Sequence, residues 1–237
     1  MRRGIAPSAL SARIGVASRT DRGVSAVGNA LTLTSFFSPT ALLRALNGAE
    51  PDIAFTAATA VPESFRVRAA IRRVYRYFQP ADAHDFHEWQ EAARRFSGPI
   101  DVRSFGRALP AGAPVWRTVE SVIVTPRPGG AVVEVRAPSF VWGMVRKIVA
   151  ALREVETGRI SIDRLDAALH GRTRLTLPMA EPEFLVLWDV EYALAWEHHW
   201  TGPNRHQLAY EKSTRDNLWA RREVLDAFST MAVPTGE

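Results

Sequence analysis

The chain has 237 residues, enough to bury a hydrophobic core as one domain or as two small ones. It carries 30 Lys and Arg against 25 Asp and Glu, and this mostly arginine-based excess fits either a phosphate-rich partner or a genome that encodes arginine often. The absence of cysteine excludes disulfides, thiolate catalysis and cysteine-bound metals. No apolar run approaches the ~18 residues of a membrane span, so we expect a cytoplasmic protein.

The first part of the chain alternates short strands with one helix. In chain order, we expect strands near residues 13–16, 29–37 and 53–61, with a helix from 39 to 47 before the last of them. Ser38 can cap the free amides of this helix, and Pro39 fits its first position. This part of the chain therefore has the order β-β-α-β.

From residue 65 onward the pattern is longer and more regular. We expect strands at 68–78, 115–126, 131–137 and 184–192, and helices at 85–96, 140–155 and 162–169. Pro128-Gly129-Gly130 predicts the hairpin between the second and third of these strands. The order β-α-β-β-α-β, with one extra helix, is typical of a ferredoxin-like domain.

Compared with this second part, the first part lacks an opening strand and helix. The sequence therefore predicts an α+β protein with two ferredoxin-like (βαββαβ) units, whose antiparallel sheets are flanked by helices and of which the first is incomplete. We divide the chain into a truncated N-terminal unit (1–64), a second unit (65–195) and a C-terminal helical extension (196–237). Trp89 and Trp142 are expected in the core.

The stretch of residues 17–26 places one carboxylate, Asp21, between Arg19 and Arg22 at a turn. Gly23 gives that turn backbone freedom. A carboxylate near guanidinium groups stays ionised, which suits a nucleophile or a base and not a general acid. On composition alone, a solvated Arg-Asp-Arg turn is the better interpretation, because surface ion pairs are common and weak.

The run Arg19-Thr20-Asp21-Arg22-Gly23-Val24 resembles the signature of the TruA family of tRNA pseudouridine synthases, in which an Arg-Thr-Asp-x-Gly-Val run carries a single catalytic aspartate. Further runs in the expected order extend the resemblance over roughly residues 14–192: Tyr75-Arg76-Tyr77, Ser104-Phe105, Met144-Val145-Arg146 and the segment 180–192. Ser18 and Ser25 stand where many bacterial members carry glycine and histidine, which is similar to the archaeal branch. The family's opening Tyr-Asp-Gly and Gly-Trp-Gln elements are not found, so the resemblance implies a shortened N-terminus.

The resemblance implies an isomerase that converts uridine to pseudouridine at about positions 38–40 of the tRNA anticodon arm, bound largely through shape and phosphate contacts. It implies a homodimer and no cofactor or metal. It also implies the following roles: Asp21 is catalytic, Arg146 pairs with it, Tyr75 stacks on the flipped base, Arg19 takes the place of the expelled base, and Ser104 and Phe105 form a pocket wall.

The residues themselves offer a partial check on these roles. In the expected helix, Arg146 lies about 100° from Val145 and away from the apolar stripe, so it can face a cleft. A solvated Arg146 and a core Tyr75 remain open alternatives. For the whole chain, the alternative is a non-catalytic basic RNA-binding protein derived from such an enzyme.

Overall fold

The structure is a computed structural model that describes residues 14–50, 52–81, 85–107, 109, 111–198 and 202–231. The expected α+β class is confirmed. Among the described residues, 14–32 and 66–193 form one compact unit, which we call the sheet unit. Residues 33–65, together with those from 194 onward, form a second one, the helical unit. The segment with Asp21 thus belongs to the same unit as residues 66–193, whereas the sequence-based boundary at residue 64 separates them.

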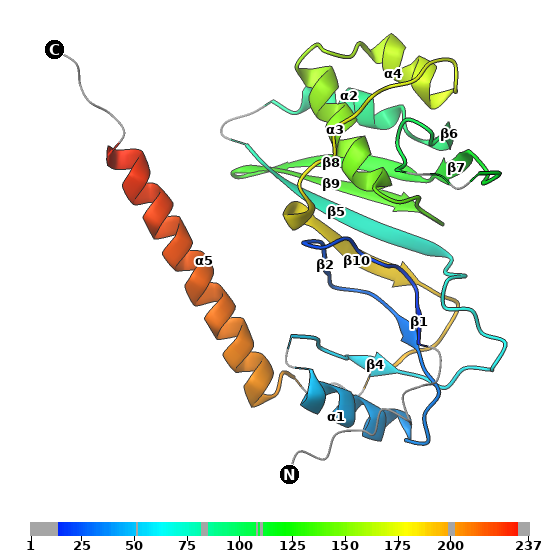
Figure 1. Cartoon of the computed structure of the whole chain (residues 1–237), viewed down its shortest axis with the longest axis vertical. Helices are drawn as coiled ribbons and strands as arrows, with labels where there is room; N and C mark the ends of the chain where they lie inside the picture. Colours follow the sequence, from blue (N-terminus) through cyan, green and yellow to red (C-terminus); the bar gives the residue numbers. More distant parts are fainter. Residues whose placement is uncertain are drawn as a thin grey trace. The chain divides into compact units, whose positions relative to one another are not determined.

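The sheet unit is built on a five-stranded sheet (Figure 1). Its strands are, in spatial order, β2 (Ser25–Ala26), β10 (Leu185–Glu191), β5 (Arg72–Pro80), β9 (Gly130–Ala137) and β8 (Ser121–Arg127). β2 runs parallel to β10, and the other neighbours are antiparallel. One face of the sheet lies under α2 (His87–Arg94) and α3 (Met144–Glu156), with α4 (Ile162–Leu169) beside α3. We call the other side the open face.

Two small antiparallel pairs complete the sheet unit. β1 (Gly15–Val16) pairs with β3 (Leu31–Thr32), and β6 (Gly98–Asp101) pairs with β7 (Trp116–Val119). The sequence predicts one strand over 115–126, but the chain changes partner at Glu120, so β7 pairs with β6 while β8 pairs with β9. The sequence did not predict β6.

Alternation along β5 decides which side chains face the helices. Arg73, Tyr75 and Tyr77 are buried on the helix side, while Arg72 and Arg76 lie on the open face. This is the alternation that the sequence predicts for the strand. A buried arginine among tyrosines is unusual in such a pattern, because an ionised group inside a core needs hydrogen-bond partners.

The start of α3 differs from the prediction. The sequence predicts a helix from Phe140 capped by Ser139, but α3 begins at Met144 and its N-cap is Gly143, with a left-handed φ of 75°. This φ favours glycine, and a Cβ atom at Gly143 would also lie 2.8 Å from the sulfur of Met179, whose side chain would have to move. Because this glycine interrupts the helical path, residues 139–142 form a loop instead of a first helical turn.

The helical unit contains α1 (Pro39–Ala49), the short antiparallel pair β4 (Ala57–Ala58) and β11 (Glu197–His198), and α5 (Arg205–Met231). The predicted start of α1 is confirmed, since the Ser38 hydroxyl accepts a hydrogen bond from the amide of Ala41. The predicted strands 29–37 and 53–61 shrink to the two-residue strands β3 and β4.

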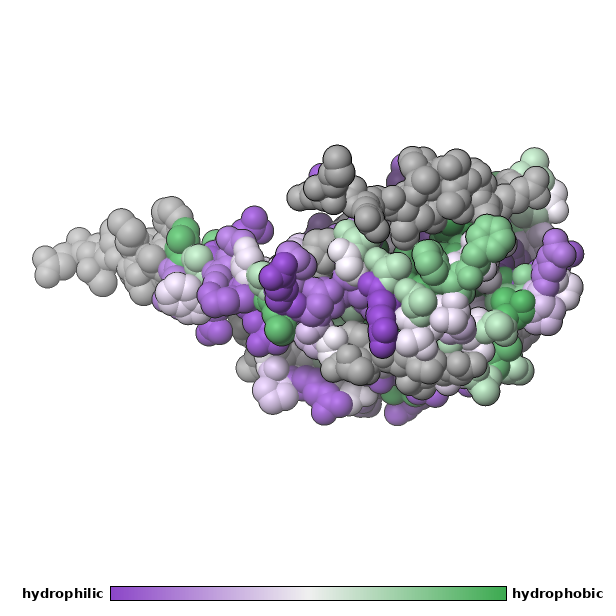
Figure 2. Space-filling model, turned by 90° about the horizontal axis from the view of Figure 1, so that it is seen from below, coloured by the Kyte–Doolittle hydropathy of each residue, from purple (hydrophilic) through white to green (hydrophobic). Residues whose placement is uncertain are grey.

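α5 is attached to the helical unit through its first turn. Gln207 is buried and donates to the Asn47 side chain and to the Ile53 carbonyl, at 3.0 Å each. Further along, hydrophilic residues dominate α5, with a few hydrophobic ones between them (Figure 2). None of the helices in the described ranges is long and apolar enough to cross a membrane.

Candidate active site

A tight turn presents Asp21 at the edge of the sheet unit. The amide of Val24 donates to the Asp21 carbonyl at 3.1 Å, which closes a β-turn with Gly23 at its third position. Gly23 has a φ of 90°, as a type II turn requires. A Cβ atom there would lie 3.0–3.1 Å from Glu183 and Pro182, so the turn also sits close against the start of β10. The positive φ favours glycine at this position, and the close neighbours add to that preference.

Both carboxylate oxygens of Asp21 are held by donors from the loop and first turn of α3. The indole Nε1 of Trp142 donates to Oδ1 at 2.7 Å, and Nη1 of Arg146 donates to Oδ2 at 3.0 Å. The Asp21 side chain keeps 26% of its surface exposed, against 14% for Arg146. The carboxylate is therefore fixed in orientation by charge-assisted hydrogen bonds and still open on one side.

Arg146 is in turn held in place from behind. Its Nε donates to the Ala180 carbonyl at 2.5 Å, so one guanidinium group joins α3, the segment before β10 and the Asp21 turn. The neighbouring Glu181 is bound by Arg153 at 2.8 Å and by the Tyr77 hydroxyl at 2.9 Å. These contacts fix the main chain that carries the Ala180 carbonyl.

We call Glu181, together with its partners Arg153 and Tyr77, the anchor of Arg146. The pKa values of Glu181 and Tyr77 show how strongly these groups interact. The carboxylate of Glu181 accepts a hydrogen bond from its own main-chain amide and further ones from Arg153 and Tyr77, which together outweigh burial and lower the pKa of Glu181 to about 2. Burial, followed by the bond to Glu181, raises the pKa of Tyr77 to about 12. The acid is thus ionised and the phenol protonated over the whole physiological range.

Arg73 ties the Asp21 turn to the sheet. Its buried guanidinium donates to the Ser18 hydroxyl at 3.0 Å and to three main-chain carbonyls, those of Ala17, Arg68 and Pro138, at 2.6–3.1 Å. All four of these acceptors are neutral, so they satisfy its donors without cancelling its charge. The group therefore connects the Asp21 turn with the loop that leads to Trp142 and leaves positive charge behind both.

Tyr75 lies next to Arg73 on β5 and faces the same space. Its ring meets that of Phe140 edge to face at 5.0 Å between centroids. Burial raises the pKa of Tyr75, opposed by a hydrogen bond with Ser18 and by the charge of Arg73. Only 8% of this residue is exposed, so the ring is held in place before any ligand arrives.

These residues line a cavity of about 770 Å³. Its walls come from the Asp21 turn, from β5 and from residues 139–146, and they include Arg19, Asp21, Tyr75, Trp142 and Arg146. A cavity of this size is in the range that holds a nucleotide-sized ligand. In the described part of the chain, no three acidic or histidine side chains gather as metal ligands would.

Two predicted site residues lie elsewhere. Phe105 is fully buried against Phe96, and the Ser104 hydroxyl accepts a hydrogen bond from the amide of Leu175. Neither lines this cavity, so their expected role as a pocket wall has no support from it and stays a prediction. Both side chains are buried, Phe105 against a residue just after α2, so they belong to the core of the sheet unit.

Trp142 and Arg73 belong to the site but were not predicted there. Trp142 was expected in the core and is instead 51% exposed, while Trp89 is buried as expected. The sequence feature that could have revealed this is Gly143. A glycine can mark the boundary between a loop and a helix, which would place Trp142 in the loop. The signal for Arg73 was its position among buried tyrosines.

The chain is similar in sequence to known proteins. Residues 92–193 match a protein family described as tRNA pseudouridine synthase. A protein of Thermococcus kodakarensis named tRNA pseudouridine synthase A is 37% identical over 215 residues, covering 90% of this chain and 75% of the relative. Proteins of the same name from Pyrococcus abyssi and Methanothermobacter thermautotrophicus are each 34% identical, covering 74% and 81% of this chain and 67% and 69% of their own lengths.

Proposed function

Because the chain belongs to the family of tRNA pseudouridine synthases, we propose that Asp21 is the catalytic residue with which it isomerises uridine in tRNA. The protein is an isomerase. The observation that carries the assignment of Asp21 is its carboxylate, oriented by Trp142 and Arg146 and open toward a nucleotide-sized cavity.

The reaction sets the demands on this site. The N1–C1′ bond of uridine breaks, the base turns while it is held, and C5 joins C1′; N1 gains a proton and C5 loses one, so no oxidant or cofactor is consumed. Attack of a carboxylate on C6 or C1′, or removal of a sugar proton, would each start it. Every route needs an ionised carboxylate with a free lone pair in a fixed direction. Asp21 fits this demand, because each of its oxygens accepts one hydrogen bond and keeps further acceptor capacity, while its side chain stays partly exposed at the cavity.

Tyr75 and Arg19 are assigned to the turning of the base, one contacting it and the other replacing it in the stem. The target nucleotide leaves its stack at a cost of a few kcal/mol, which contacts in the cavity must offset. Tyr75 supplies a ring that Phe140 and its burial keep in one orientation, suited to contact with the turned base. Arg19, exposed two residues before Asp21, is suited to fill the place that the base has left.

We assign the substrate to uridines at about positions 38–40 of the tRNA anticodon arm, read mainly through shape and phosphate contacts. The names of the relatives support tRNA as the substrate. Exposed Arg19 and Arg68 at the cavity support phosphate contacts.

The test is to incubate the purified protein with unmodified tRNA transcripts and to map pseudouridine by chemical derivatisation and reverse transcription. We expect conversion within positions 38–40 and none by the Asp21→Asn variant. Conversion only at other positions would overturn the assigned substrate. Tight tRNA binding without conversion at any position would favour the non-catalytic RNA-binding alternative.

We also propose that the protein works in the cytoplasm as a homodimer, and that the sheet unit is one ferredoxin-like unit. The second proposal is supported by the order β10-β5-β9-β8, with α2 between β5 and β8 in the chain and α3 between β9 and β10. Sedimentation equilibrium of the full chain tests the dimer, and a monomer at micromolar concentration would contradict it.

A further inference from the structure

Trp142 stays half-exposed although it is hydrogen-bonded to Asp21. Half of the residue, 51%, is exposed, although its N–H edge lies against the carboxylate. It lines the cavity together with Asp21 and Tyr75. A large aromatic side chain left open in a nucleotide-sized cavity is a candidate for contact with the ligand.

One face of the indole is covered by a cation. The guanidinium of Arg107 lies over the ring at 4.5 Å from its centroid, and the Arg107 amide donates to the Trp142 carbonyl at 2.8 Å. Arg107 occupies one face of the ring and Asp21 its N–H edge, which leaves the opposite face as the large surface without a contact among those described for this half-exposed residue. That face is therefore available for a flat partner.

We propose that the open face of Trp142, backed by Arg107, is a stacking platform for a nucleobase that neighbours the target uridine. This inference rests on the function proposed above and extends it to a second base of the same RNA. Stacking on an aromatic side chain is tolerant of base identity, because every base has a π face. The platform would therefore add affinity and hold the strand without selecting a sequence.

The ring is prepared for this contact in two ways. Its hydrogen bond to Asp21 and the Arg107 contact fix both torsions of the side chain, so little rotamer entropy is lost when a base arrives. Arg107 also adds positive charge beside Lys147, whose pKa burial and then Arg107 lower. An adjacent phosphate would relieve this repulsion.

Two substitutions separate stacking from the hydrogen bond to Asp21. Trp142→Phe keeps an aromatic face and removes the N–H donor, so we expect the Kd for tRNA within about 3-fold of wild type and a fall in kcat. Trp142→Ala removes both, so we expect the Kd to rise by about 5- to 100-fold, the range that one stacked base commands. Trp116→Ala is the matched control, because Trp116 is 49% exposed and does not line the cavity. We expect it to bind like wild type.

The direct probe is an anticodon stem-loop RNA with 2-aminopurine next to the uridine that the wild-type protein converts. Stacking on the indole quenches its fluorescence, so we expect quenching by wild type and by Trp142→Phe, and its loss in Trp142→Ala. Equal quenching and equal Kd for wild type and Trp142→Ala would overturn the platform while leaving the isomerase assignment intact. If no uridine of any tRNA is converted, the proposed function fails, and Kd values measured with whole tRNA still decide whether Trp142 contributes binding.

Discussion

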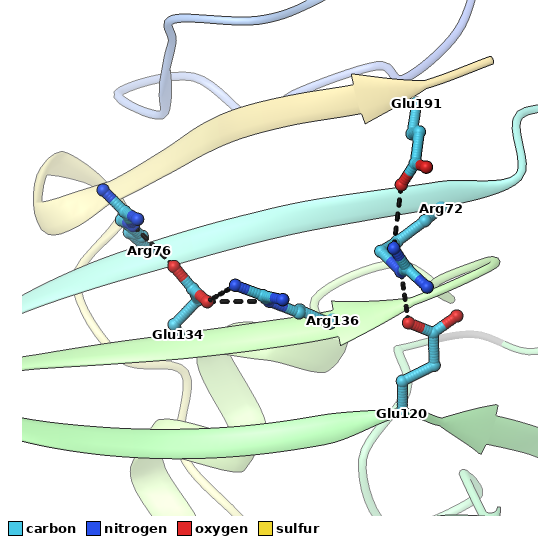
Figure 3. A network of polar contacts seen from close by, with 6 residues as sticks. All are labelled: Arg72, Arg76, Glu120, Glu134, Arg136 and Glu191. Carbon is cyan, nitrogen blue, oxygen red and sulfur yellow. Dashed lines mark hydrogen bonds and ion pairs between the residues drawn. The ribbon is translucent and has the colours of Figure 1, made fainter.

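Carboxylates pair with guanidinium groups on both faces of the sheet at β5, but the two faces differ in what these pairs do. On the helix side, one carboxylate, Asp21, is held by one guanidinium and one indole beside a cavity. On the open face, three arginines and three glutamates form a network across the neighbouring strands (Figure 3). Its members are Arg72, Arg76, Glu120, Glu134, Arg136 and Glu191.

The difference lies in how the charges are balanced. Glu134 binds Arg76 at 2.7 Å and Arg136 at 2.6 Å, while Arg72 bridges two other glutamates, so the three positive and three negative charges of the two groups sum to zero over this face. At the site, Arg146 balances Asp21, and Arg73 adds a buried positive charge with four neutral acceptors. The open-face network therefore stabilises the sheet modestly, whereas the site keeps a net positive field for an anionic substrate.

The largest effect is expected from removing the carboxylate of Asp21, the residue proposed to be catalytic. Asp21→Asn keeps the shape of the side chain but is a poor nucleophile and a poor base, so we expect turnover to fall by at least about 10³-fold. Affinity for tRNA should stay within a few-fold, because phosphate contacts dominate it. Single-turnover assays and filter binding measure the two quantities. Turnover near the wild-type rate would remove Asp21 from its role.

The next prediction compares Arg146, on the helix side of the sheet, with Arg76, on its open face. Arg146→Lys keeps the charge but loses the fork that reaches both Asp21 and the Ala180 carbonyl, so we expect kcat to fall by about 100-fold with the Tm nearly unchanged. Arg76→Lys on the open face is the matched control, and we expect it to leave kcat unchanged. If both variants turn over equally well, the geometry of the Asp21 pair is not required.

Acid should weaken the anchor behind Arg146. The pKa of Glu181 is about 2 in the folded protein and near 4.5 when unperturbed, so its contribution is complete above pH about 4.5 and is lost as pH falls toward 2. Because its side chain is 53% exposed, we expect this contribution to be only about 1 kcal/mol. Urea unfolding of wild type and Glu181→Gln across this range measures it. Parallel pH profiles of the two proteins would contradict the anchor.

The smallest effect is expected at the edge of the open-face network. Glu120→Gln leaves Arg72 paired with Glu191 at 2.8 Å, so the free energy of unfolding should change by less than about 0.5–1 kcal/mol. Turnover should be that of wild type. A loss of turnover without a loss of stability would mean that this face takes part in catalysis or substrate binding, and the contrast between the two faces would fail.

Local sequence signals were sufficient for much of the framework. Ser38-Pro39 predicted the start of α1, the predicted helix 162–169 has the observed bounds, and alternation predicted which side chains of β5 are buried. The Asp21 turn with Gly23 was also foreseeable, because a turn residue with positive φ leaves a local mark in the sequence. These features depend on residues close together in the chain.

The assembled site depends on contacts that no local pattern encodes. Trp142 and Arg146 reach Asp21 across more than 120 residues, and the loop that allows this exists because Gly143 lies against Met179 in a left-handed conformation. The same alternation that places Arg72 and Arg76 on the open face buries Arg73, and only packing of the turn against the sheet provides its four acceptors. Residue types and spacing thus determined most of the elements, and the family resemblance pointed to Asp21, while tertiary packing decided which donors bind its carboxylate, because hydrogen bonds between distant segments depend on how whole elements pack together.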